Sequence, residues 1–198
     1  INGGHQNTLI GSLAGDAITT GESNIAIGYN ALSAEDTHNG NVAIGYNTLA
    51  IQNAGANAYN TVIGYAAGQS VSTGIRNTIM GGWAGTALTT GAYNVAIGYG
   101  ALQGEDAHGY NTAVGMQALN ALNAGADAYN VAVGYHAGLA MSTGTYNTII
   151  GGLAGDALTT GSYNTALGYS ALSAEDAHSY NTAVGYDALA AQNAGADA

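Results

Sequence analysis

The sequence predicts an all-β fold, a parallel β-solenoid of about eleven coils, each seventeen or nineteen residues long, and three observations support this prediction. A seven-residue phrase, clearest as YNTAVGY at 180–186, recurs eleven times. Each copy holds an Asn with a Gly four residues later, and successive copies are 17 residues apart except at two places, where they are 19 apart. The chain has no proline, whose missing N–H would interrupt the ladders between stacked coils. The phrase Asn residues are Asn7, Asn24, Asn41, Asn60, Asn77, Asn94, Asn111, Asn130, Asn147, Asn164 and Asn181.

The phrase predicts a short strand in each coil. Counted from its Asn as position one, position two is Thr, Val or Ile, position three is mostly Ala, and position four is a bulky aliphatic residue, as in Thr182, Ala183 and Val184. Period-two alternation and β-branched residues are typical of strands. We expect positions two and four to fill the coil interior. The small positions one, three and five should then form an outer face that packs against another surface.

A second run follows the Gly, typically Tyr-x-Ala-Leu, and leads into a turn rich in Gly, Asp, Asn and Ser. This run predicts a second short strand in every coil. Stacked coils rise about 4.8 Å each, so eleven coils would form a rod of roughly 50 Å. We expect the Asn amides to hydrogen-bond along their column. The Gly column should serve an unusual backbone angle or the close approach of the next coil.

The coils are grouped into a larger 70-residue unit that spans four of them. Residues 141–198 match residues 71–128 at 41 of 58 positions. One coil in each unit is two residues longer and carries NAGANAY or NAGADAY, which predicts an outward bulge. We therefore expect one repeat domain over 1–198, as a fragment of a longer fibre.

Composition excludes several classes of partner. Twelve carboxylates oppose one cation, Arg76, which gives a formal net charge of −11. Such a chain repels phosphate backbones and anionic headgroups, so we expect no nucleic-acid partner and no direct membrane insertion. The absence of cysteine excludes disulfides and thiolate metal sites.

The repeated YNTAVGY phrase, followed by a Gly-rich or Asn-rich turn, resembles two families of fibre repeats. It is similar to the head repeats of trimeric autotransporter adhesins, and more so to repeats of bacteriophage tail fibres and related bacterial surface fibres. The resemblance covers the whole chain. It implies a left-handed β-roll, a homotrimer around one axis, and an extracellular location on a virion tail or a bacterial cell surface. The coils of those adhesin heads are shorter, which implies a longer second turn here.

The strongest candidates for chemistry are three Glu-Asp-x-His turns, one in each 70-residue unit. Carboxylates and an imidazole within four residues could ligate a divalent cation, and a trimer would gather three copies at one level. The alternative is a solvated turn in which an acidic side chain caps backbone N–H groups. The candidate residues are Glu35, Asp36, His38, Glu105, Asp106, His108, Glu175, Asp176 and His178.

The functional expectation is a structural or adhesive fibre segment, a rigid shaft or head that presents a receptor-binding end. One alternative is a surface that itself binds a host-cell glycan or protein through two columns of tyrosines. A remote alternative is an ice-binding solenoid, based on the TTG turns at 19–21, 89–91 and 159–161. We expect no enzyme, because the candidate residues recur along the chain and do not define one cleft. We also expect no cofactor other than such a divalent cation.

Overall fold

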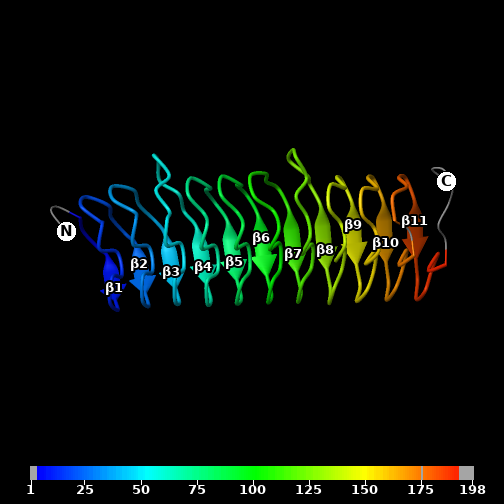
Figure 1. The fold of residues 1–198 in the computed structure, drawn as a ribbon, viewed down its shortest axis with the longest axis horizontal. Coiled ribbons are helices and arrows are strands. Elements are labelled where there is room, and N and C mark those ends of the chain that lie inside the picture. Colours follow the sequence, from blue (N-terminus) through cyan, green and yellow to red (C-terminus); the bar gives the residue numbers. More distant parts are fainter. Residues whose placement is uncertain (1–3, 175, 192–198) are drawn as a thin grey trace.

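The computed structural model describes residues 4–174 and 176–191, and it confirms the parallel β-solenoid. Eleven strands of three residues lie in one sheet in chain order (Figure 1). Each strand pairs in parallel with the next, and the register joins equivalent phrase positions, as in Thr8 with Ile25. The strands are β1 (Thr8–Ile10), β2 (Ile25–Ile27), β3 (Val42–Ile44), β4 (Thr61–Ile63), β5 (Thr78–Met80), β6 (Val95–Ile97), β7 (Thr112–Val114), β8 (Val131–Val133), β9 (Thr148–Ile150), β10 (Thr165–Leu167) and β11 (Thr182–Val184).

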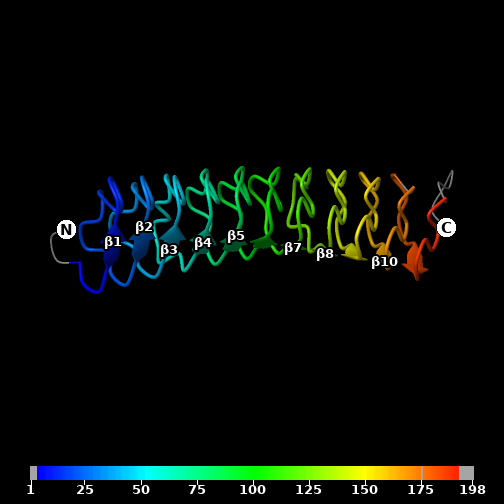
Figure 2. The same ribbon diagram turned by 90° about the horizontal axis from the view of Figure 1, so that it is seen from below.

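The coils stack along the long axis, so that β1 and β11 lie at opposite ends of a rod (Figure 2). Two loops project beyond the others, between β3 and β4 and between β7 and β8 (Figure 1). They belong to the two longer coils of the described chain, which carry NAGANAY and NAGADAY, and they confirm the predicted bulges. The described part of the chain holds no helix with the length and hydropathy needed to cross a bilayer.

The second strand predicted in each coil is wrong. Residues in the Tyr-x-Ala-Leu run form turns, because positions seven and nine take left-handed backbone angles, as at Asn30 (φ 56°) and Leu32 (φ 51°). A left-handed residue reverses the chain direction and cannot continue an extended strand. Each described coil therefore has one strand, and turns make up the rest of it.

The predicted orientation of the strand is also wrong. Position three points into the coil and is fully buried in every strand from β2 to β10, as at Ala26 and Ala113. Positions two and four, including Val95 and Ile97, flank it and are only half-buried or exposed. The reason is the Asn at position one, which hydrogen-bonds inside the coil and so turns position three inward with it.

The side chains at positions three and nine fill the narrow interior of each coil together, and their sizes complement each other. In most coils position three is Ala and position nine is Leu, as in Ala113 and Leu119. Where position three is Ile, position nine is Gly, as in Ile79 and Gly85, and a Cβ at Gly85 would come within 3.1 Å of the Ile79 Cδ1. One large side chain at these two positions thus satisfies the close packing that a protein interior requires.

The coil of β8 departs from this balance, because it has a small residue at both positions, Ala132 and Gly138. Neighbouring side chains fill the space instead. A Cβ at Gly138 would lie 3.0 Å from the Leu119 Cδ2 and 3.5 Å from the Met141 Cε. The flexible Met141 side chain, which is fully buried, is suited to such an irregular gap.

The Asn column links three parts of neighbouring coils. The Asn77 Oδ1 accepts a hydrogen bond of 2.9 Å from the Asn94 backbone N–H in the next coil. Its Nδ2 donates to the Gly91 carbonyl oxygen at 2.8 Å, which fixes the turn that precedes Asn94. The column is structural, as expected, but most of its bonds join side chain to backbone, in place of the predicted amide-to-amide stack.

The Gly column meets both of the conditions expected for it. Gly98 has φ of 131°, outside the regions open to residues with a Cβ. A Cβ there would also clash with the carbonyl oxygen of Gly115 in the next coil. This close approach sets the spacing of the coils at the end of each strand.

Candidate functional site

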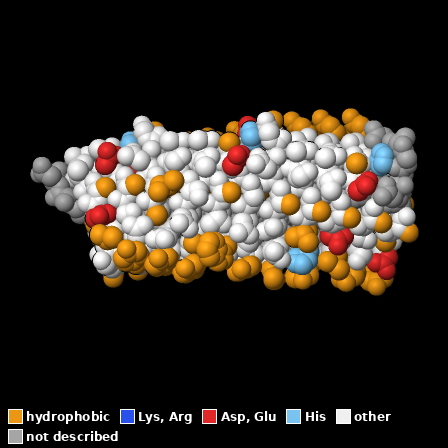
Figure 3. Space-filling model, in the orientation of Figure 1, with side chains coloured by type: hydrophobic (Ala, Val, Ile, Leu, Met, Phe, Trp, Pro, Cys, Tyr) orange, Lys and Arg blue, Asp and Glu red, His pale blue; other side chains and the backbone are white. Residues whose placement is uncertain are grey.

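The outer face of the sheet is the most extensive feature that the fold leaves unexplained. Positions two and four of every strand point outward, and no described strand contains a charged residue. Ile10, Met80, Leu167 and Val184 are between 41% and 63% exposed, and the other position-four side chains are half-buried. Figure 3, which counts tyrosine and tryptophan as hydrophobic, shows hydrophobic side chains along one long edge of the rod and acidic side chains in separate small groups. We call positions two and four of all eleven strands the sheet face.

A tyrosine ladder runs along the position before the Asn. Six rings stack with their centroids 4.8 to 5.3 Å apart and their planes within 13° of parallel. The rings are between 39% and 63% exposed. The pKa of the Tyr129 phenol is raised, mainly because its surroundings desolvate it and also because of Tyr110 and the Asp127 carboxylate. The members of this ladder are Tyr93, Tyr110, Tyr129, Tyr146, Tyr163 and Tyr180.

Arg76 closes the first end of the tyrosine ladder. Its guanidinium carbon lies 5.4 Å from the centroid of the Tyr93 ring, a cation–π contact, and Nη1 donates a 2.5 Å hydrogen bond to the Tyr93 hydroxyl. Arg76 occupies the equivalent position one coil earlier, with φ of 57°. The single cation of the chain therefore supports the stack.

The tyrosines after the phrase Gly form shorter stacks. Tyr29, Tyr46 and Tyr65 stack in sequence, with centroids 5.4 and 5.1 Å apart. Trp83 packs at 57° on Tyr65, in a coil where Gly82 takes the usual tyrosine position. These contacts agree with a structural role for Trp83.

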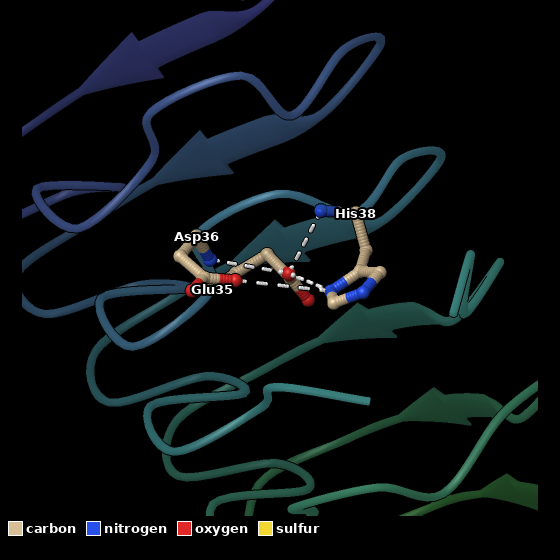
Figure 4. Close-up of side chains that lie close together, drawn as sticks. All are labelled: Glu35, Asp36 and His38. Atoms are coloured by element: carbon tan, nitrogen blue, oxygen red, sulfur yellow. Dashed lines mark hydrogen bonds and ion pairs between the residues drawn. The ribbon is translucent and has the colours of Figure 1, made fainter. Parts of the chain in front are cut away.

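The first Glu-Asp-x-His turn is organised around a buried carboxylate (Figure 4). Glu35 is fully buried, and its Oε1 accepts the backbone N–H groups of Asp36 at 3.2 Å and His38 at 3.1 Å. The His38 Nδ1 lies 2.8 Å from the same oxygen and 3.9 Å from the Asp36 Oδ1. Three nitrogen atoms thus surround the Glu35 Oε1, which is the geometry of a capped turn.

The second turn repeats this arrangement. The Glu105 Oε1 accepts the His108 N–H at 3.1 Å and lies 3.2 Å from the His108 Nδ1, and its Oε2 accepts the Ala124 N–H at 3.3 Å. Ligand atoms of Glu105, Asp106 and His108 lie within 4.8 Å of one another, as do those of the first turn.

The third turn is described only in part, since Glu175 lies outside the described residues. The His178 carbonyl oxygen accepts a 3.0 Å hydrogen bond from the Asn164 Nδ2, and the Asp176 carbonyl accepts a 2.6 Å bond from the Thr159 Oγ1. Equivalent atoms of the first turn make the same two bonds. The backbone of the third turn is therefore held to its neighbouring coil in the same way.

The structure brings the first two sets of predicted ligands together, and N–H groups occupy the Glu35 Oε1 and both carboxylate oxygens of Glu105. Glu35 and Glu105 occupy position twelve, which is an aliphatic core position in other coils, for example Leu88 and Leu122. Burying a carboxylate there is costly unless donors surround it. Both oxygens of Glu105 have donors, whereas the Glu35 Oε2 is buried with no hydrogen-bond partner among the described residues.

The sheet face was not predicted from the sequence, because the larger aliphatic residues of each strand were expected in the interior. The balance between positions three and nine would have revealed the true orientation. Position three is Ile only in coils where position nine, six residues later, is Gly. This pattern indicates that the two side chains share one confined space. The described residues form no pocket.

Comparison of the chain with protein-family models found no match, and comparisons with curated proteins and with solved structures found none either.

Proposed function

We propose that this chain is a rigid segment of an extracellular fibre, a homotrimer whose three rods meet through the sheet face. The observation that carries the proposal is the uncharged, largely aliphatic face that runs along all eleven strands. Its apolar side chains recur at every coil, so a rod with the same repeat can match them over the whole length. The resemblance to trimeric fibre repeats supports three chains. The parent would be a phage tail fibre or a bacterial surface fibre.

Two further features support a mechanical role. Each coil bonds to the next through the strand ladder and the Asn column, so stiffness is distributed along the rod. The tyrosine ladder adds stacking between neighbouring coils. Such a segment would hold a terminal receptor-binding part at a distance from the particle or cell, and the proposal gives it no catalytic step.

The alternative of a glycan-binding tyrosine surface has less support. Sugars stack on the open faces of aromatic rings, but inside the tyrosine ladder each ring face is covered by its neighbours, as at Tyr146, whose centroid lies 5.3 and 5.0 Å from those on either side. The ladder presents ring edges and hydroxyl groups to solvent. A protein or glycan receptor would therefore have to bind by hydrogen bonds to these edges or through the projecting loops.

One observation favours ice binding as a second candidate. A row of Thr side chains that could bind ice lies on the sheet face and not in the TTG turns. Position two of the strands holds Thr8, Thr61, Thr78, Thr112, Thr148, Thr165 and Thr182. Outward Thr residues beside aliphatic residues could order water, although Ile25, Val42, Val95 and Val131 interrupt the row. Thermal hysteresis of the purified chain would support this candidate, and burial of the same face in a trimer would exclude it.

The trimer is tested with a charge placed on the sheet face. Ile97→Glu lies in β6, near the middle of the rod, between Met80 and Val114 of the adjacent strands. Burying an unpaired carboxylate in an interface costs several kcal/mol, so this variant should sediment as a folded monomer. The control is Ala126→Glu in the exposed β7–β8 loop, which should remain a trimer. If both variants sediment like the unmodified chain, the sheet face is not the interface.

A further inference from the structure

We propose that the tyrosine ladder is a site of oxidative cross-linking, at which a peroxide-driven one-electron oxidant joins neighbouring tyrosines into dityrosine within one chain. The proposal does not depend on the number of chains in the fibre. It rests on the distances in the ladder, on its exposure, and on the scarcity of other oxidisable side chains.

The stacking places the reacting carbons side by side. Dityrosine forms by a bond between Cε atoms, the ring carbons next to the hydroxyl-bearing carbon. Tyr146 and Tyr163 have centroids 5.0 Å apart and planes 6° from parallel. They hold equivalent positions in successive coils, so we expect their equivalent Cε atoms to lie about as far apart as the centroids. Both side chains are nearly half exposed, at 47% and 49%. Rotation about the side-chain bonds can therefore close the remaining gap without moving the buried core.

The ladder is also open to an oxidant, as are the other tyrosines of the chain. The protein has 14 tyrosines, no cysteine, one tryptophan and three methionines. Thiols, which react first with oxidants in most proteins, are thus absent. Arg76 covers the ladder at Tyr93, but the edges of the later rings remain open to solvent.

The reaction balances with hydrogen peroxide as the oxidant and a haem peroxidase as the one-electron carrier. Each of two tyrosines gives up one electron and its phenolic proton and becomes a neutral tyrosyl radical. The two radicals couple through one new Cε–Cε bond, and the hydrogen on each of these carbons moves to the neighbouring phenolic oxygen. One peroxide accepts the two electrons and two protons and leaves as two waters.

Three exposed tyrosines outside the tyrosine stacks provide an internal control for the ladder. In the described part of the rod, Tyr59, Tyr99 and Tyr135 stack on no other tyrosine, although they are 50% to 54% exposed. They are as accessible as the ladder rings but lack a partner tyrosine in contact. Radicals formed on them should decay without coupling inside the chain.

The test treats the folded chain with a haem peroxidase and hydrogen peroxide and measures dityrosine fluorescence and cross-linked peptides. Cleavage at acidic residues cuts at Asp156, so a Tyr146–Tyr163 link would hold two fragments together. The triple variant Tyr110, Tyr146 and Tyr180→Phe keeps six stacked rings but leaves no two tyrosines adjacent in the ladder. It should lose this link and the larger part of the fluorescence.

The matched control is the triple variant Tyr59, Tyr99 and Tyr135→Phe, which removes the same number of phenols and should keep the full yield. The unmodified chain unfolded in urea keeps all 14 tyrosines and should lose most of the intrachain product, while free tyrosine in the same urea checks that the peroxidase is active. Equal yields from the two triple variants would overturn the proposal. So would a product found only between chains, seen as covalent dimers on a denaturing gel.

Discussion

At the scale of single residues, buried polar groups decide how well each coil fits the next. In Glu105 every buried polar atom of the side chain has a partner, since both carboxylate oxygens accept hydrogen bonds from N–H groups. Gln52 is also fully buried, but its Nε2 has no hydrogen-bond partner among the described residues. The equivalent residue of the next 70-residue unit is Leu122, which needs none.

Gln52→Leu should therefore stabilise the chain. It removes a buried unpaired N–H group, which costs about 1–3 kcal/mol. The Asn60 Nδ2 loses its bond to Gln52 but keeps its 2.8 Å bond to the Gly74 carbonyl. Urea unfolding should show a higher free energy of unfolding at an unchanged slope. A loss of stability would contradict the assignment of the Gln52 Nε2 as an unpaired buried group.

A second prediction at this scale concerns Asp156, whose pKa is raised. Partial burial is the main cause, and the nearby backbone N–H groups and His136 oppose it. A carboxyl group with a raised pKa binds its proton more tightly in the folded chain, so stability increases as pH falls through that pKa. Near neutral pH the charged carboxylate is destabilising.

Asp156→Thr, which copies the equivalent Thr86, should thus raise the free energy of unfolding near neutral pH. The gain should shrink toward about pH 3, where the carboxyl is protonated in both states. Urea unfolding at several pH values measures the difference between variant and parent. A difference that does not change with pH would contradict the assignment of the shift to Asp156.

At the scale of the element, the sequence predicted the strand in each coil but not its orientation. The eleven phrases specified the strands, their parallel order and their register, because a regular spacing leaves one way to stack them. The orientation depends on where the Asn side chain bonds, and alternation alone is the same for either face. The second strand was wrong because the left-handed angles at Leu32 and its equivalents come from tertiary packing, against the preference of Leu itself.

The candidate metal turns were located by their residue types, but their hydrogen bonds could not be predicted. The spacing of Glu35 and His38 brings the two side chains together in a turn, as expected. The complete burial of Glu35 follows from its place at position twelve, which the residue pattern alone did not place in the core. The backbone donors around its carboxylate depend on turn geometry that residue types alone do not define.

The balance between positions three and nine can be tested in the coil of β6. Ala96→Ile should overfill the coil and cost about 1–3 kcal/mol. Leu102→Gly should leave a cavity and cost about 2–5 kcal/mol. The double variant recreates the native pairing of Ile79 with Gly85, so its free energy of unfolding should lie within about 1.5 kcal/mol of the parent. Additive losses in the double variant would show that the two positions do not share one space.

At the scale of the whole molecule, the 70-residue unit should act as a removable block. Deleting 71–140 joins equivalent positions, so the ladders and the Asn and Gly columns keep their register. The shortened chain should fold and associate as before, with a rod shorter by about 19 Å in X-ray scattering. Deleting only 71–80 shifts the coil phase, exposes core residues and should cause aggregation. A harmless ten-residue deletion would contradict the solenoid repeat.

The proposal that the sheet face joins three rods is tested most directly by the mass of the unmodified chain in solution. Sedimentation equilibrium over a range of concentrations should give three times the chain mass of 19.5 kDa, because an isolated rod would leave its aliphatic face in water. The circular dichroism of the same sample shows whether the chain is folded. A stable, well-folded species of 19.5 kDa at every concentration would contradict the proposal.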